Sequence, residues 1–233
     1  AGLNAAAQVN PESEPPQSAA PSYEEAVLAS QNGSIESALQ NAERHAAAGN
    51  DKAQVMAGYI YLNGETGAPD ANKAVQYFRL AAAQKNTDAY MALGKTALSA
   101  QAGLSASDAI TWFSRASLAG RVDAKRAIGE MYIKGQGIAP NLEKGRSWLR
   151  QAVDFGDALA ARKLADTYYD NDAKEALSLY ERAAGYGDHE AAYIAAIMLA
   201  ENLDIPLDIS LSLFPIVIMT MTIERMALLW DEY

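Results

Sequence analysis

The sequence contains no cysteine and little histidine, and each shortage excludes a class of protein. Without cysteine there is no disulfide framework, no thiolate zinc site and no cysteine nucleophile, although this absence does not fix a cellular compartment. Among 233 residues there are 2 histidines and 8 prolines. Positive charge is also scarce, with 19 basic against 29 acidic residues and a net charge of −10. Such a surface repels polyphosphate, so nucleic-acid binding is disfavoured.

Motifs that carry chemistry are equally scarce. His45 and His189 lie far apart in the sequence, and neither Gly-x-Ser-x-Gly nor His-Glu-x-x-His occurs. The run Gly94-Lys95-Thr96 lacks the upstream glycine of a phosphate-binding loop, because position 89 is alanine. We therefore predict no catalytic residue, no bound metal and no cofactor.

The first 22 residues are dominated by Pro, Ala, Ser, Gln and Glu, which is typical of a disordered linker. Ala1-Gly2 would suit the position after a signal-peptidase cut, so the chain begins either at a mature N-terminus or at a trimmed end. A Pro-rich stretch of this length would serve an envelope protein as a tether.

The rest of the chain is built from a repeated unit. The units begin at Ala53, Ala89, Ala124, Ala160 and Ala191, which are 36, 35, 36 and 31 residues apart. Five residues after each of these alanines stands a small residue: Gly58, Gly94, Gly129, Ala165 and Ala196. The second half of the unit repeats as well, with one column formed by Tyr77, Trp112, Trp148 and Leu179. Regular spacing of this kind predicts a repeat protein.

Each unit is predicted to be a hairpin of two helices. In the first unit Ala53, Ala57 and Tyr61 share one helical face. The small residue beside that face should let the second helix approach, and the aromatic column should fill the gap. The turns need positive φ, which glycine adopts at little cost, and the expected glycines are Gly64, Gly67, Gly135 and Gly137. Asp70 and Asn141 should cap the helices that follow. The Gly-x-Gly pairs are thus interpreted as helix stops.

The pattern resembles the Sel1-like repeat, a relative of the tetratricopeptide repeat. The best copy runs from Ala124 to Gly156, and the resemblance covers roughly residues 34–208. The resemblance implies an all-α fold, a right-handed α-solenoid of about four to five stacked hairpins with an N-terminal capping hairpin and a concave groove. The expected parts are a linker at 1–22, a cap at 23–50, units at 51–86, 87–121, 122–156 and 157–187, a partial unit at 188–208 and an apolar tail at 209–233.

Binding is the kind of function that remains. The candidate binding surface is a row of equivalent positions on the first helix of each unit. The second and sixth residues after each leading alanine should point away from the core of the first helix. They are Val55, Tyr59, Met91, Lys95, Arg126, Glu130, Arg162, Asp166, Tyr193 and Ile197. A stripe with apolar ends and a charged middle would suit a peptide or a partner helix. The alternative is that these are merely solvent-facing positions. The aromatic residues Tyr77, Phe78, Trp112, Phe113, Trp148 and Tyr180 are interpreted as core.

The tail departs from the repeat. Residues 209–223 carry no charge, and as a helix they would span about 22 Å, short of a bilayer core of about 30 Å. Three interpretations are open: an apolar capping helix, a truncated membrane segment, or a fused piece of another protein. Residues 214–233 resemble a segment of bacterial multi-pass proteins with an inactive transglutaminase-like domain. The residues expected to bind or anchor are Phe214, Ile216, Ile218, Met221, Met226, Leu229 and Trp230.

These observations favour a non-catalytic adaptor or scaffold in a bacterial periplasm or cell envelope, with a cytoplasmic protein as the alternative location. It would hold a partner protein or peptide, such as a membrane protein, in its groove and regulate or assemble a membrane-associated complex. Membrane contact is expected only through residues 209–223. One alternative function is a carbohydrate- or peptidoglycan-active hydrolase that uses Glu130 and Asp166, whose carboxylates would have to lie close together. Another is a protein anchored in a membrane by its tail.

Overall fold

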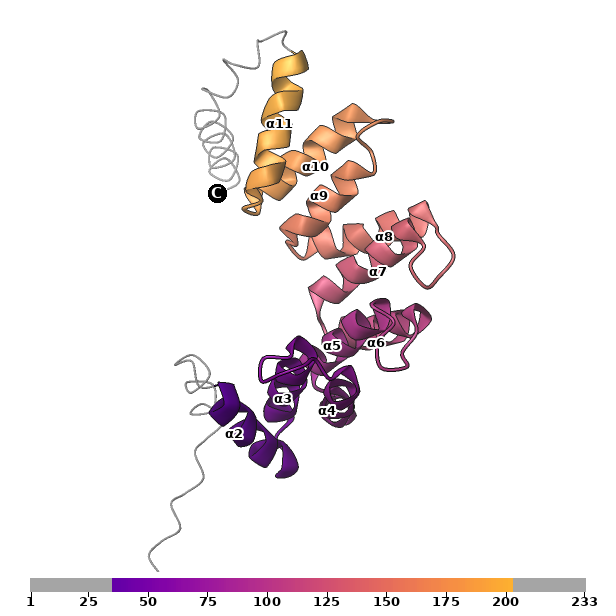
Figure 1. Ribbon diagram of the computed structural model, residues 1–233. Helices are drawn as coiled ribbons and strands as arrows, with labels where there is room; N and C mark the ends of the chain where they lie inside the picture. Colours follow the sequence, from indigo (N-terminus) through magenta and orange to yellow (C-terminus); the bar gives the residue numbers. More distant parts are fainter. Residues whose placement is uncertain (1–34, 203–233) are drawn as a thin grey trace, which may run out of the picture.

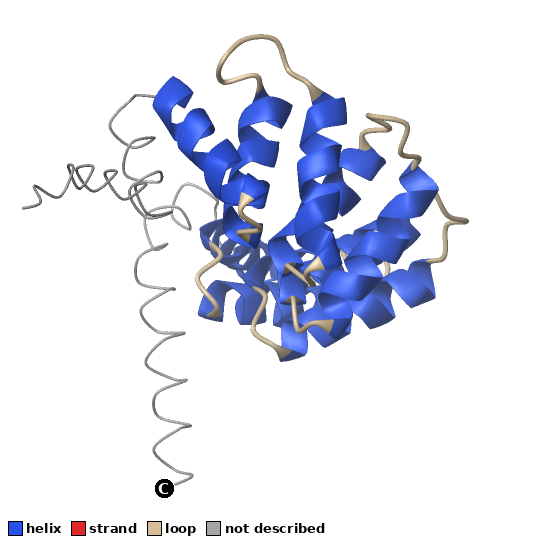
Figure 2. Ribbon diagram, turned by 90° about the horizontal axis from the view of Figure 1, so that it is seen from below, coloured by secondary structure: helices blue, strands red, loops and turns tan. Residues whose placement is uncertain are grey.

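The computed structural model describes residues 35–202, and within this range it contains ten helices and no strand (Figures 1 and 2). The expected linker, the first part of the expected cap and all the named tail residues lie outside the described range. The helices are α2 (Ile35–Ala47), α3 (Asp51–Asn63), α4 (Ala71–Ala83), α5 (Thr87–Leu98), α6 (Ala106–Leu118), α7 (Val122–Lys134), α8 (Leu142–Asp154), α9 (Ala158–Asp166), α10 (Ala173–Gly185) and α11 (His189–Asn202).

The helices pair into hairpins and the hairpins stack. The pairs are α3 with α4, α5 with α6, α7 with α8 and α9 with α10, and α2 and α11 pack at the two ends. All the extensive helix–helix contacts among the described residues join helices that are consecutive in the chain. The stack curves, so α2 and α11 lie on the same side of its middle at α7 and α8 (Figure 1). The predicted all-α solenoid is confirmed.

The predicted helix stops and caps are confirmed. Gly64 and Gly135 end α3 and α7 with φ of 68° each, in the left-handed region that glycine adopts without a side-chain clash. The side chains of Asp70 and Asn141 accept hydrogen bonds from the backbone N–H groups of Lys73 and Lys144, each at 2.9 Å. Gly64 and the Gly135-Gln136-Gly137 run therefore end helices in this chain.

The second hairpin makes its turn without that motif. Between α5 and α6 the backbone takes positive φ at Ala100 (51°), Ala102 (54°) and Gly103 (72°). Alanine pays a steric cost in this region, because its Cβ approaches the following carbonyl oxygen. The turn geometry is thus kept even where the glycines are missing.

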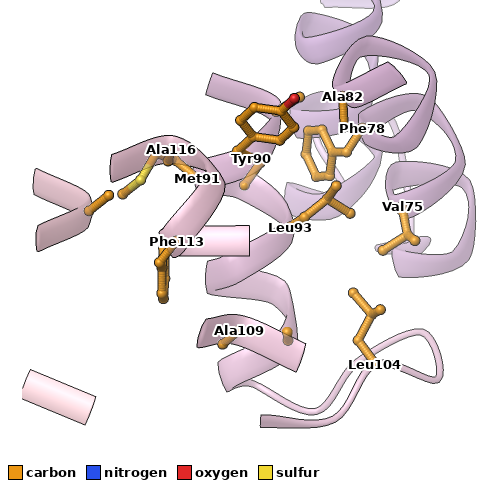
Figure 3. Packing of buried hydrophobic residues seen from close by; sticks show 14 of the residues in the cluster. Val75, Phe78, Ala82, Tyr90, Met91, Leu93, Leu104, Ala109, Phe113 and Ala116 are labelled. Carbon is orange, nitrogen blue, oxygen red and sulfur yellow. The ribbon is translucent and has the colours of Figure 1, made fainter. Parts of the chain in front are cut away.

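Close packing within each hairpin depends on the small residue of the first helix. A Cβ added to Gly58 would meet the Phe78 ring at 2.4 Å, and one added to Gly94 would meet the Phe113 ring at 2.4 Å. Phe78 is fully buried and lies with Tyr90 and Leu93 in one core cluster (Figure 3). In these two hairpins the residue that fills the gap is therefore one position later than expected. Tyr77, Trp112 and Trp148 of the expected column are half-buried, whereas Leu179 is buried.

The core consists of two clusters that meet in the α7–α8 hairpin. One runs from Ala74 to Met131 and the other from Leu149 to Met198. Between them two glycines face each other: a Cβ on Gly129 would lie 3.0 Å from the carbonyl oxygen of Gly145. The two helices thus cross with their backbones close together, and the side chains of Leu149 and Ile133 pack against the two glycines.

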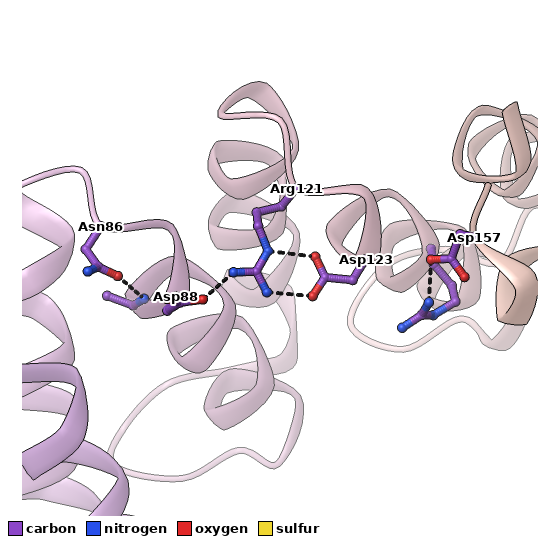
Figure 4. Close-up of polar contacts among 7 residues, drawn as sticks. Asn86, Asp88, Arg121, Asp123 and Asp157 are labelled. Carbon is purple, nitrogen blue, oxygen red and sulfur yellow. Dashed lines mark hydrogen bonds and ion pairs between the residues drawn. The ribbon is translucent and has the colours of Figure 1, made fainter. Parts of the chain in front are cut away.

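Polar contacts connect the start of each unit to the unit before it. The Asn86 side chain donates to Asp51 at 2.7 Å. Arg121 pairs with Asp88, and Arg126 pairs with Asp157 (Figure 4). Arg121 also pairs with Asp123 at 2.8 Å, and its hydrogen bonds lower the pKa of that carboxyl group. We call this series the inter-unit ladder; it continues with Arg162, whose Nε lies 2.8 Å from Asp188 Oδ2.

Candidate partner-binding site

Two residues of the predicted groove stripe, Glu130 and Asp166, lie at one cavity. They belong to consecutive first helices, α7 and α9, and occupy the same position in their units. Because stacking brings equivalent positions of neighbouring units together, a stripe that is spread over the sequence becomes one continuous surface. In this part of the stack Glu130 and Asp166 line one cavity.

The other stripe residues have different surroundings. Lys95 and Tyr193 are exposed, whereas Val55, Tyr59 and Ile197 are half-buried. Arg126 and Arg162 belong to the inter-unit ladder. The placement of Met91 on the groove surface is wrong: its side chain is 3% exposed and lies in the first core cluster.

The cavity that Glu130 and Asp166 share has a volume of about 300 Å³ and carries charges of both signs. We call it the charged cavity, and its lining residues are Glu130, Ile133, Lys134, Leu142, Lys163, Asp166 and Thr167. Lys134 Nζ lies 3.2 Å from a Glu130 carboxylate oxygen, and Arg126 lies 3.9 Å from the other. Ile133 and Leu142 form apolar parts of the wall between these charged groups. A wall of mixed apolar and charged groups can bind a segment of a protein.

A second cavity adjoins the first through Asp166. It has a volume of about 360 Å³, and we call it the tyrosine cavity after its residues Asp166, Tyr169, Asp170, Tyr180 and Ile194. The Tyr180 hydroxyl donates to Asp166 Oδ1 at 2.7 Å. Burial and this hydrogen bond raise the pKa of Tyr180, so the hydroxyl remains a donor at neutral pH.

The chemistry available at the two cavities is ionic and apolar contact. Within residues 35–202 no three His, Asp or Glu side chains are grouped so that they could hold a metal ion. The hydrolase alternative needs two acids at one site, and the structure does bring Glu130 and Asp166 there. Glu130, however, already has two cationic partners, which gives it a structural role in the cavity wall.

Several cavity residues were missed by reasoning from the sequence, chiefly Lys163, Tyr169 and Asp170. They lie in or just after α9, which has nine residues where α3 and α7 have thirteen. The signal was the short step of 31 residues between the last two leading alanines.

Comparison with known families identifies the repeated unit. Residues 51–86, 122–157 and 158–185 match the family described as the Sel1 repeat. The chain therefore carries Sel1 repeats. The α5–α6 hairpin lies outside these matches although it has the same packing. Its turn lacks Gly-x-Gly, as does the turn of the matched α9–α10 hairpin.

A different family matches the end of the chain. Residues 191–233 match a family described as seven transmembrane helices usually fused to an inactive transglutaminase. The suspected resemblance of the tail is thus confirmed, and it begins earlier than expected, within α11. None of the helices in residues 35–202 is both long and apolar enough to span a membrane.

Solved structures that resemble this one include other Sel1-repeat proteins. One is a protective antigen present in uropathogenic Escherichia coli strains, with an SLR fold, 26% identity and a TM-score of 0.66 over 78% of this chain. Another is a Sel1 repeat protein from Oxalobacter formigenes, with 25% identity and a TM-score of 0.65 over 76% of this chain. This chain spans 41% of the length of the first protein and 77% of the second.

Proposed function

We propose that this Sel1-repeat chain is a non-catalytic adaptor that holds a segment of a partner protein on the surface formed by α7, α9 and α11. The observation that carries the proposal is the pair of adjoining cavities, which share Asp166 and extend across consecutive first helices. A protein segment that lies along this surface would bury side chains in both cavities. Concave surfaces built from stacked repeats are suited to such extended contacts.

We further propose that the adaptor works in a bacterial envelope, next to a membrane protein. Support comes from residues 191–233, which match a family of membrane helices directly after the repeats. The Pro- and Ala-rich sequence of residues 1–22 agrees with a tether. In this proposal the partner belongs to a membrane-associated complex whose assembly or activity the adaptor regulates.

Site-specific photo-cross-linking tests the proposed surface. A photoreactive residue at Lys163, in the charged cavity, should cross-link a partner in envelope extract. The same residue at Leu118, which is 90% exposed on α6, is the matched control and should not. Equal cross-linking from both positions, or none from either, would contradict the proposal.

The same capture also tests the role of the tail, by comparing the whole chain with a version that ends at Leu203. Capture by the shorter version alone would mean that residues 204–233 occupy the partner's place. If both versions capture the same partner, the tail is not the occupant of the site. Hydrolysis of a glycan by the purified chain that is lost in Glu130→Gln would favour the hydrolase over the adaptor.

A further inference from the structure

The tyrosine cavity lies where α9 ends one turn early. α9 ends at Asp166, and the chain then turns through Tyr169 and Asp170 before α10 begins at Ala173. In α3 and α7 the corresponding space holds a further turn of helix. The shortened helix therefore leaves an opening between the α9–α10 turn, Tyr180 of α10 and Ile194 of α11.

Two carboxylates and no basic side chain line this cavity. They are Asp166 and Asp170, and neither forms an ion pair with any residue between 35 and 202. Arg162 is the neighbouring cation whose charge acts on Asp166 and Tyr180, and it is paired with Asp188 and Glu190. The Tyr180 hydroxyl orients the Asp166 carboxylate through Oδ1, which leaves the second oxygen available. Two like charges at one cavity repel each other, and a cation placed between them removes that cost.

The walls are tyrosine rings, which favour the same kind of ligand. Tyr169 and Tyr180 meet edge to face, with ring centroids 6.4 Å apart, and Tyr169 is 44% exposed. The face of an aromatic ring attracts an ammonium or guanidinium group. A cation in this cavity would therefore gain both ionic and aromatic contacts.

In two other units of the chain, a lysine of the unit itself lies over a tyrosine ring. In the first unit Lys73 Nζ lies 4.7 Å from the centroid of Tyr61, and in the third Lys144 Nζ lies 5.7 Å from that of Tyr132. Both lysines stand at the same position of the second helix. In the fourth unit this position is Glu175, and the equivalent tyrosine, Tyr168, instead has the guanidinium of Arg146 from α8 over its ring, 3.9 Å from the centroid. The two rings of the tyrosine cavity, Tyr169 and Tyr180, have no cation of the described residues over them.

We propose that the tyrosine cavity binds a lysine or arginine side chain of the partner protein, while an apolar side chain beside it enters the charged cavity. The inference rests on the proposed adaptor function and specifies the partner's chemistry. Ile133 and Leu142 provide the apolar contact, and the shared Asp166 places the two cavities next to each other. The net charge of −10 further favours a basic segment.

Peptide binding to the full chain tests this inference. The probes are fluorescein-labelled Gly/Ser peptides that hold one leucine next to one arginine, in both orders, and matched peptides with citrulline, which has the shape of arginine without its charge. Fluorescence anisotropy should show about tenfold tighter binding of an arginine peptide. Its affinity should fall as salt is added. Equal affinity for arginine and citrulline, or no binding of any peptide, would overturn the inference.

Variants of the chain test whether the preference for arginine arises at the tyrosine cavity. Asp170→Asn should remove about tenfold of the arginine preference. Glu36→Gln, on α2 at the far end of the stack, makes the same change in net charge and should leave the preference intact. Asp170→Lys should reverse the preference, so that a glutamate peptide binds better than the arginine peptide. Identical behaviour of Asp170→Asn and Glu36→Gln would overturn the inference. If the partner still cross-links from Lys163 in that case, the adaptor function stands and only the cation assignment fails.

Discussion

At the scale of single residues, the turn after each second helix shows what a repeat requires of its backbone. The residue that follows the cap has positive φ in every described unit: 92° at Gly120, 81° at Gly156 and 95° at Gly187. In the first unit this residue is Lys85, with φ of 66°. A side chain in the left-handed region costs roughly 1–2 kcal/mol, so Lys85 is a strained member of a glycine column.

Lys85→Gly should therefore stabilise the protein. Relief of the steric cost exceeds the entropy that glycine adds to the unfolded chain, and we expect the free energy of unfolding to rise by about 1 kcal/mol. Urea denaturation followed by circular dichroism measures the change. Lys85→Ala is the control, because it removes the same charge but keeps the Cβ. Equal stabilisation by alanine would show that charge, and not backbone strain, is the cause.

At the scale of secondary structure, the helices and their ends follow from local patterns. Asp70 and Asn141 were predicted as caps because side-chain capping depends on neighbours in the sequence. The rotation of each helix was predicted less well. Met91 was expected on the surface and Tyr77 in the gap beside Gly58, but helix rotation depends on how tightly two helices approach, and Phe78 fills that gap. The tyrosine cavity could not be predicted, because it arises where a helix ends early against two others.

The attachment of α2 to the first hairpin predicts a pH dependence. The Tyr61 hydroxyl donates to Glu43 Oε1 at 2.6 Å, and Tyr77 donates to the same oxygen at 3.3 Å. The bond to Glu43, with burial, raises the pKa of Tyr61 to about 12. Because the folded-state pKa lies above the ordinary value of 10.0, this contact stabilises the fold fully below pH 10 and is lost as the pH rises toward 12.

Tyr61→Phe should consequently lower the free energy of unfolding by about 1 kcal/mol at pH 8, with solvent screening of this accessible bond taken into account. The difference from the unmodified protein should shrink between pH 10 and pH 12. Tyr132→Phe is the matched control, because Tyr132 holds the same place in the third unit and donates to no carboxylate of the described residues. If the loss of unfolding free energy in Tyr61→Phe stays constant up to pH 12, the hydrogen bond from Tyr61 to Glu43 is not its cause.

At the scale of the whole molecule, the two core clusters should form two blocks that differ in their local stability. The two core clusters meet at the crossing of Gly129 and Gly145, and all extensive contacts join consecutive helices. In such an array a local loss of packing spreads only through the neighbouring interface.

Leu93→Ala and Leu164→Ala form a matched pair for this division, since the first leucine is 0% and the second 1% exposed, each in a different cluster. Each substitution should cost roughly 2–5 kcal/mol in its own block. Native-state hydrogen exchange should show reduced protection in α4 to α7 for Leu93→Ala and in α8 to α11 for Leu164→Ala. Equal loss of protection in both blocks for either variant would mean that the stack unfolds as one unit.

The early end of α9 has a consequence for how such arrays diversify. Each hairpin is supported by the hairpins on both sides, so one of them can lose a turn of helix while the stack persists. In most globular folds a deletion inside a core helix removes contacts that nothing else replaces. Here α9 is shorter than the first helices of the other units, and Tyr169 and Asp170 line an opening at its end. With the binding function proposed above, variation in unit length, as well as variation in residue type, becomes a source of new specificity in this architecture.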